Sequence, residues 1–241
     1  MNKPIEVHWE AEIAGTPEQV WDAITRRAAA WVWEIEYEPR EGGSERGLTE
    51  GGGTVTVWEP FRHFVTTSLD GTNRLDFALE PRGTGTYLRY RHNGVLDADN
   101  YATEDDACRR HTAFYNHSLR EYVEHFAGRE PVYLEAHAPE SSAAGGLARV
   151  RAALGVPEDA EVGDKVSLNP EGVEAIEGVI DFVEPAFLGI RTADCFYRLY
   201  GRDAWGWPVG FARHHFGGGG PLAGQEAWAA WLNGIFTEAV A

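Results

Sequence analysis

His92 is the side chain in this sequence whose position points most directly to chemistry. Leu88 and Tyr90 precede it at alternate positions, and the side chains of a strand alternate between its two faces. If Leu88 and Tyr90 face the interior, His92 faces it too. An imidazole has a pKa near neutrality and could act there as a general acid or base. It could equally satisfy a neighbouring backbone group, so the pattern leaves both roles open.

The two cysteines offer a second kind of chemistry. Cys108 precedes the basic run Arg109–His111, and nearby positive charge lowers the pKa of a thiol. The sequence positions no base beside it, however, so we expect Cys108 to have a packing role. Together with Cys195 it forms neither a disulfide framework nor a CxxC metal motif. Reduced cysteines are typical of a cytoplasmic protein, and this is the location that we predict.

We do not expect the neighbouring histidines and acidic residues of this sequence to form a metal site. His214 and His215 are adjacent, so in a strand they point to opposite faces and cannot bind one ion together. His117, Glu121 and His125 are spaced by four and would align on a helix, but opposite its apolar stripe. No GxSxG motif is present. We therefore predict no metal, no cofactor and no complete catalytic constellation.

The first half of the chain begins with a strand and a helix. Apolar and polar residues alternate over residues 5–13, which predicts a half-buried strand. Thr16 is a favourable N-cap, Pro17 suits the first helical turn, and Gln19 completes a capping box. A short helix around Trp31 follows before the chain turns into a strand.

Short strands and one long helix complete this half. Segments rich in β-branched and aromatic residues are separated by turn residues, which predicts an antiparallel meander. They span residues 54–58, 61–68, 74–80 and 86–92. From about residue 103 to 126, Tyr115, Leu119, Tyr122 and Phe126 recur at helical spacing. We therefore predict an α+β fold in which a curved antiparallel sheet wraps around a long C-terminal helix. The space between them holds side chains or a ligand.

The second half repeats features of the first at a constant offset. Glu10–Ala11 matches Glu135–Ala136, and Glu59–Pro60 matches Glu184–Pro185, both at an offset of 125 positions (135 − 10 and 184 − 59). Each half also ends in a predicted helix. A tandem duplication of one fold explains these matches together.

We accordingly predict two domains, at residues 1–128 and 131–241, joined by the turn-forming segment Gly128–Pro131. The second copy diverges from the first. It lacks an early Gly–Gly pair, and Ser141–Ser142 precedes its first helix in place of Thr–Pro. We expect a degenerate, partly shortened copy whose pocket could be smaller or closed.

Several motifs of the first half occur in an order that is found in a known family. They are the strand-to-helix segment Ile13–Ile24, a tryptophan at position 31 or 33, Arg40–Gly43, Gly51–Gly53 before Pro60, and Gly85–Gly94. In this order they resemble the START/Bet v 1-like (SRPBCC) helix-grip superfamily. Within it, they are most similar to the family related to the C-terminal domain of the activator of Hsp90 ATPase.

This resemblance implies a helix-grip fold with a cavity between the sheet and the long helix. Non-catalytic binding of a hydrophobic or amphipathic small molecule is our main interpretation. The alternatives are a polyketide cyclase or aromatase-like enzyme and a chaperone-associated factor. Aromatic rings with a polar edge suit the walls of such a cavity. Our candidate ligand-binding residues are Trp9, Trp21, Trp33, Phe77, Tyr90, His92, Tyr115 and Tyr122.

Charge and hydropathy exclude several classes of partner. Acidic residues number 38 and basic residues 21, which gives a net charge of −17. Such a chain repels phosphate backbones and anionic lipids, so we expect neither nucleic acid nor a membrane as partner. No apolar segment resembles a signal peptide or reaches the roughly 18 residues of a membrane span. The expected partner is a hydrophobic small molecule, and a homodimer is compatible with the sequence.

Overall fold

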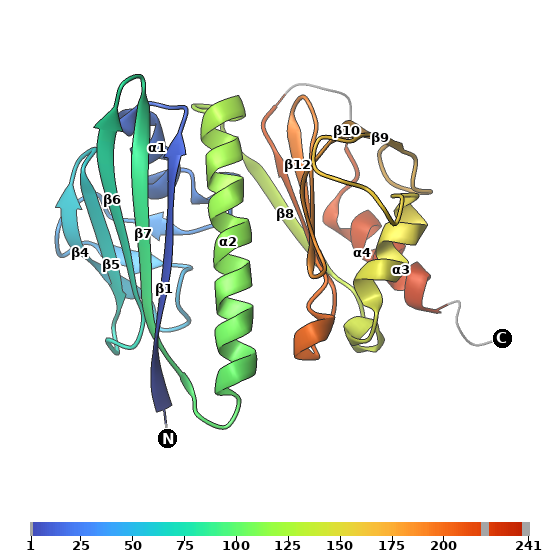
Figure 1. Cartoon of the computed structure of the whole chain (residues 1–241), viewed down its shortest axis with the longest axis horizontal. Coiled ribbons are helices and arrows are strands. Elements are labelled where there is room, and N and C mark those ends of the chain that lie inside the picture. The colour runs from blue at the N-terminus through green and yellow to red at the C-terminus, as the bar shows by residue number, and fades with distance from the viewer. Residues whose placement is uncertain (1, 218–221, 238–241) are drawn as a thin grey trace. The chain divides into compact units, whose positions relative to one another are not determined.

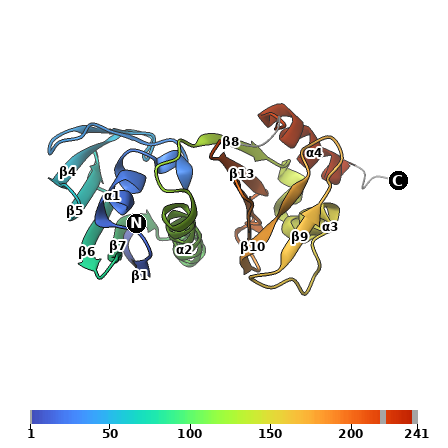
Figure 2. The same cartoon turned by 90° about the horizontal axis from the view of Figure 1, so that it is seen from above.

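The computed structural model describes residues 2–217 and 222–237 of the chain. The chain divides into two compact units, residues 1–131 and 132–241. Each unit contains one antiparallel sheet with its helices on one side (Figures 1 and 2). The predicted α+β class is therefore confirmed.

The first unit is built on a seven-stranded sheet with the order β1-β7-β6-β5-β4-β3-β2. Its first strand pairs with its last over twelve residues, and the other strands follow in reverse order of sequence. The strands are β1 (Asn2–Ile13), β2 (Glu36–Tyr37), β3 (Ser44–Arg46), β4 (Gly53–Glu59), β5 (His63–Ser68), β6 (Arg74–Arg82) and β7 (Gly85–Asp97). The meander predicted from the alternating segments is thus present, with longer strands at its end.

Two helices and one short 3-10 turn cover this sheet. They are α1 (Pro17–Thr25), η1 (Ala28–Ala30) and α2 (Tyr101–Phe126). The capping box at α1 forms as predicted: Thr16 Oγ1 accepts from the Gln19 amide, and Gln19 Oε1 accepts from the Thr16 amide. Gly15, just before the cap, is required by close packing, because a Cβ there would collide with Val123 of α2.

The second unit contains a six-stranded sheet with the order β8-β13-β12-β11-β10-β9. Its core consists of apolar side chains from the helices α3 (Gly146–Leu154) and α4 (Gln225–Thr237) and from the face of the sheet that they cover. The strands are β8 (Val132–His137), β9 (Lys165–Leu168), β10 (Ile176–Glu184), β11 (Phe187–Arg191), β12 (Cys195–Tyr200) and β13 (Gly210–His215). The helical segments are η2 (Glu140–Ala143), α3 (Gly146–Leu154), η3 (Asp203–Trp205) and α4 (Gln225–Thr237).

The two units share one topology. In each, the first strand pairs with the last, a helix follows the first strand, and a helix follows the last. Both sequence matches fall on equivalent elements: Glu10–Ala11 and Glu135–Ala136 lie in the first strands. Glu59 and Glu184 end strands β4 and β10, which occupy the same place in their sheets. The tandem helix-grip arrangement is therefore confirmed at the level of the fold.

The helices were compared with the length and hydropathy of membrane-spanning segments. None of the helices in the described residues is both long enough and apolar enough to span a membrane.

Candidate functional site

A cavity of about 180 Å³ lies between the first sheet and α2. Its walls come from the segment after η1, the start of β6, the middle of β7 and the N-terminal half of α2. Leu48, Asn73 and Trp33 of its lining are half-buried, whereas Trp31, Phe77 and Tyr90 are buried. The cavity is therefore lined by buried side chains on one part of its wall and by half-buried ones on another.

Two tryptophans form an apolar wall of this cavity. The indole Nε1 of Trp31 donates to the Ala23 carbonyl at 3.0 Å, and that of Trp33 donates to the Gly47 carbonyl at 2.7 Å. Because both indole N–H groups are satisfied by the backbone, the rings are fixed and offer carbon surfaces to the cavity. Trp33 also packs edge-on against Tyr115, with ring centroids 5.5 Å apart.

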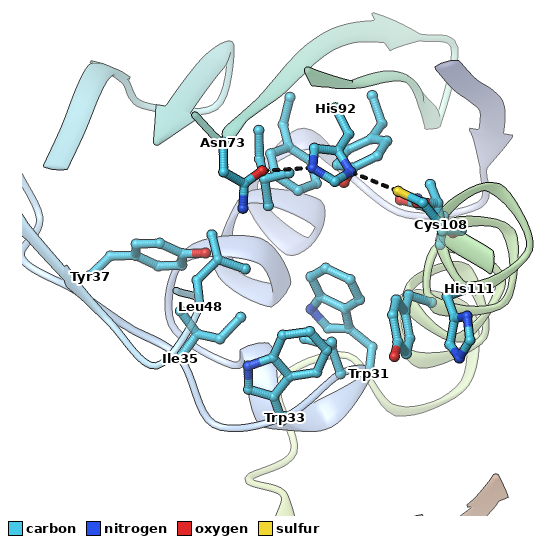
Figure 3. A pocket seen from close by; sticks show the side chains of 16 residues that line it. Trp31, Trp33, Ile35, Tyr37, Leu48, Asn73, His92, Cys108 and His111 are labelled. Carbon is cyan, nitrogen blue, oxygen red and sulfur yellow. Dashed lines mark hydrogen bonds between the residues drawn. The ribbon is translucent and has the colours of Figure 1, made fainter. Parts of the chain in front are cut away.

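A chain of three polar side chains crosses the opposite side (Figure 3). His92 Nε2 lies 2.6 Å from Asn73 Oδ1, and His92 Nδ1 lies 3.4 Å from Cys108 Sγ. With the Asn73 carboxamide in this orientation its oxygen faces His92 and can only accept a hydrogen bond, which assigns the imidazole proton to Nε2. Nδ1 is then an acceptor, and the Cys108 thiol donates to it.

Burial keeps both titratable members of this chain neutral. Desolvation of the charged imidazole lowers the pKa of His92 to about 4. Burial also raises the pKa of the Cys108 thiol, and a hydrogen bond from Thr112 opposes that shift only in part. At pH 7 the pair is thus a thiol and a neutral imidazole, in contrast to the thiolate that the basic run Arg109–His111 suggested as one possibility.

Asn116 supplies the other polar feature of the cavity lining. It is 2% exposed, and its Nδ2 donates to the Thr112 carbonyl at 2.9 Å. Its Oδ1 has no hydrogen-bond partner among the residues that the structure describes. Exchanging the two amide atoms would set an oxygen against the Thr112 carbonyl, so the unpaired atom is the acceptor. Such an atom is complementary to a donor group on a ligand.

Five of the eight candidate ligand-binding residues line this cavity and are brought together by it: Trp33, Phe77, Tyr90, His92 and Tyr115. The inward orientation of His92 follows the period-two argument, since Leu88 and Tyr90 are buried on the same face. Their role in binding stays a prediction.

The remaining three candidates lie outside the cavity lining. Trp21 packs edge-on against Trp58, with centroids 4.9 Å apart, and belongs to an aromatic cluster with Phe61 and Phe64. Tyr122 is buried and its hydroxyl donates to the Arg129 carbonyl at 2.8 Å, which ties the end of α2 to the following loop. Trp9 is half-buried on β1, the strand that makes the most contacts with α2.

Seven polar or aromatic residues of the cavity lining were not among the candidates: Trp31, Tyr37, Asn73, Cys108, His111, Thr112 and Asn116. Trp31 is signalled by the tryptophan motif that the resemblance rests on. Asn73 precedes β6 and meets His92 only because β6 pairs with β7, with Leu75 opposite His92. Cys108 and Asn116 share a helix face with Thr112 at intervals of four, which is a signal that the sequence does contain.

The second unit has different side chains at the equivalent positions of its sheet. Ala11 pairs with Leu88 and Trp9 with Tyr90, whereas Ala136 pairs with Phe211 and Leu134 with Arg213. The match of Ala11 to Ala136 therefore places Arg213 at the position of Tyr90. That guanidinium lies 2.6 Å from Glu174, whose carboxylate also accepts from Tyr197 and Trp228.

An aromatic stack lies beside this ion pair. Trp228 of α4 is fully buried and stacks on Phe211 with ring centroids 4.2 Å apart. The described interior of the second unit thus contains an ion pair and an aromatic stack where the first unit has Tyr90 and its cavity.

One cluster in the second unit has the donor set of a metal site. Single ligand atoms of Asp194, Cys195 and His215 lie within 4.8 Å of one another. Burial raises the pKa of Cys195 to about 12, so its thiol is protonated at neutral pH. A thiol binds metal as the thiolate, so an ion bound here would have to displace the proton of Cys195.

Comparison with known proteins places the first unit. No curated protein sequence matches the chain. Solved structures that resemble it include the Aha1 dimer from Colwellia psychrerythraea (19% identity, 50% of this chain, 96% of that one, TM-score 0.41). Another is protein BH1534 from Bacillus halodurans, with 21% identity over 52% of this chain and 100% of that one and a TM-score of 0.45. A third is CalU16 from Micromonospora echinospora, with 17% identity over 49% of this chain and 86% of that one and a TM-score of 0.37.

A family assignment rests on the sequence of the first unit. Residues 14–124 match the family described as activator of Hsp90 ATPase homolog 1-like protein. This range starts at the end of β1 and runs almost to the end of α2, so it includes every element that lines the cavity. The first domain of the chain is therefore an activator of Hsp90 ATPase homolog 1-like domain of the SRPBCC superfamily.

Proposed function

We propose that the first domain binds a small amphipathic molecule in the cavity between its sheet and α2. The observation that carries this proposal is an apolar cavity whose lining includes a buried, unpaired hydrogen-bond acceptor, Asn116 Oδ1. An unpaired buried polar atom costs about 1–3 kcal/mol. A ligand that donates to Asn116 recovers this free energy, and the tryptophan wall contributes apolar contact.

The size of the cavity limits the ligand. A buried apolar cavity of about 150 Å³ accommodates benzene. The present volume of about 180 Å³ therefore suits one ring with a short substituent. Molecules of three or four fused rings exceed it, which argues against a cyclase acting on large polycyclic substrates in this form of the domain.

Calorimetric titration with a matched pair of probes tests the proposal. p-Cresol and toluene differ by one hydroxyl group, and only p-cresol donates a hydrogen bond. We expect p-cresol to bind on the order of tenfold more tightly, because its hydroxyl pairs with Asn116. The variant Asn116→Leu, which has a similar shape, should abolish this difference while leaving toluene binding in place.

Variants at two leucines separate the cavity from the surface. Leu48→Trp places a large ring at the half-buried side of the cavity and should block both probes. Leu69→Trp is the matched control, since Leu69 is exposed and does not line the cavity. Equal binding by both tryptophan variants, or no binding by the unmodified protein, would contradict the proposal.

A further inference from the structure

The three linked side chains in this cavity have the arrangement of a nucleophile, its base and an orienting group. We propose that Cys108, His92 and Asn73 form an acyl-transfer site that accepts the acyl group of a small ester on the Cys108 sulfur. This inference deepens the proposed function and rests on it, because the ester must first occupy the same cavity.

Geometry assigns a role to each member of the triad. Cys108 Sγ lies 3.4 Å from His92 Nδ1, within the range of a sulfur hydrogen bond, so the imidazole can take the thiol proton. Asn73 Oδ1 accepts from His92 Nε2 at 2.6 Å and thereby fixes the tautomer that leaves Nδ1 unprotonated. Cysteine, histidine and asparagine in these roles form a known variant of the catalytic triad.

Before reaction the Cys108 thiol and the His92 imidazole are both neutral, and this determines how the thiol is activated. Asp105 and Arg109 are the charged neighbours of Cys108, and they act on its pKa in opposite directions. The thiol therefore keeps its proton until attack, and His92 removes it as the sulfur–carbon bond forms. The arrangement matches general-base assistance and does not require a preformed thiolate.

Other polar groups of the cavity complete the site. The hydroxyls of Thr112 and Tyr90 belong to side chains that line the same cavity as Cys108. They are the available donors for the oxygen of a tetrahedral intermediate. Asn116 Oδ1, the unpaired acceptor of the same cavity, would hold a donor on the substrate.

The reaction balances with an ester and water alone. The sulfur of Cys108 attacks the carbonyl carbon while its proton moves to His92 Nδ1. The carbon–oxygen bond then breaks, the leaving alcohol takes that proton, and an S-acyl cysteine remains. Water attacks this thioester, giving one proton to His92, and the carbon–sulfur bond breaks. The sulfur takes the proton back, and the carboxylic acid is released.

p-Tolyl acetate and its unreactive ether analogue, 4-ethoxytoluene, test the inference on the full chain. We expect intact-mass and peptide analysis to show one acetyl group, located on Cys108. Cys108→Ser should remove the label, and Cys195→Ser is the matched control, because Cys195 is buried in the second unit. The rate should exceed that of N-acetylcysteine at the same pH and concentration.

The base and the orienting residue have separate readouts. His92→Gln should slow acetylation roughly a hundredfold or more. A slower reaction of the unmodified protein in D₂O reports the same proton transfer without any substitution. Asn73→Ala should slow acetylation as well, and ¹⁵N NMR should show that His92 has lost its preference for the Nε2–H tautomer.

Binding of the ether distinguishes failure of this inference from failure of the proposed function. If 4-ethoxytoluene binds but Cys108 is acetylated no faster than the free thiol, the acyl-transfer site is refuted and the binding cavity stands. An acetylation rate that is unaffected by His92→Gln also refutes it. If neither compound enters the cavity but p-cresol does, only the acyl-transfer site is refuted; if p-cresol is excluded as well, both proposals fall.

Discussion

Replacing His92 with glutamine is expected to remove part of the pH dependence of folding stability. The pKa of His92 is lowered from 6.5 to about 4 in the folded protein, because burial disfavours the charged imidazole. Between these two pH values the unfolded chain binds a proton that the folded chain does not. The free energy of unfolding therefore falls as the pH is lowered through this window, and it is unaffected by His92 above it.

The magnitude follows from the two pKa values. Over the whole window the loss is about 3 kcal/mol, and about 2 kcal/mol of it falls between pH 7 and pH 5. Other titrating groups are common to the unmodified protein and His92→Gln. The difference between the two proteins in their stability change from pH 7 to pH 5 therefore isolates His92.

Urea denaturation at pH 7 and pH 5 provides the assay, with NMR signals of first-domain residues separating that domain's transition from the second. A direct titration of the His92 Cε1–H resonance should show only about a tenth of the imidazole protonated at pH 5. If His92 instead titrates near its ordinary pKa, or if both proteins lose equal stability on acidification, the assigned neutral state of the Asn73–His92–Cys108 chain is wrong.

Three further substitutions have expected costs that urea denaturation can measure. Gly15→Ala should destabilise the first domain by about 1–3 kcal/mol, because the added Cβ collides with Val123. An unchanged stability would mean that α2 shifts to accommodate the methyl group at no cost. Thr16→Ala should cost about 1 kcal/mol through loss of the α1 capping box, and an unchanged midpoint would assign that box no net stability. Arg213→Met should cost the second domain about 3–5 kcal/mol, since it leaves the Glu174 carboxylate buried without its partner; a stable variant would show that Glu174 takes up a proton.

The sequence-based prediction succeeded where local pattern and packing agree. Strict alternation identified β1, and the capping box identified the start of α1. The same period-two argument placed His92 on the inward face of β7. These features depend on neighbouring residues only, so the sequence contains all the information they need.

Prediction was weaker where the site depends on residues that are distant in sequence. Asn73 lies 19 positions from His92, and only the pairing of β6 with β7 brings their side chains to 2.6 Å. Aromatic composition alone could not separate Trp33, which lines the cavity, from Trp21, which packs against Trp58. Aromatic rings serve cores and cavities equally well, and their place is decided by tertiary packing.

The two units show how one topology provides two kinds of interior. At equivalent places in their sheets, the first unit has Tyr90 beside a cavity, and the second has Arg213 paired with Glu174. Although burial alone would raise it, the hydrogen bond and charge of Arg213 keep the pKa of Glu174 below its ordinary value. We expect the proposed ligand to bind in the first domain, where the cavity with Asn116 lies.

The side-chain amide resonance of Asn116 in a ¹H–¹⁵N spectrum offers the most direct test of the proposed cavity site. On titration with p-cresol, this signal should shift saturably in the unmodified protein and should stay unchanged in Leu48→Trp. If the Asn116 signal is unaffected while p-cresol shifts resonances elsewhere, or shifts none, the cavity beneath α2 is not the binding site.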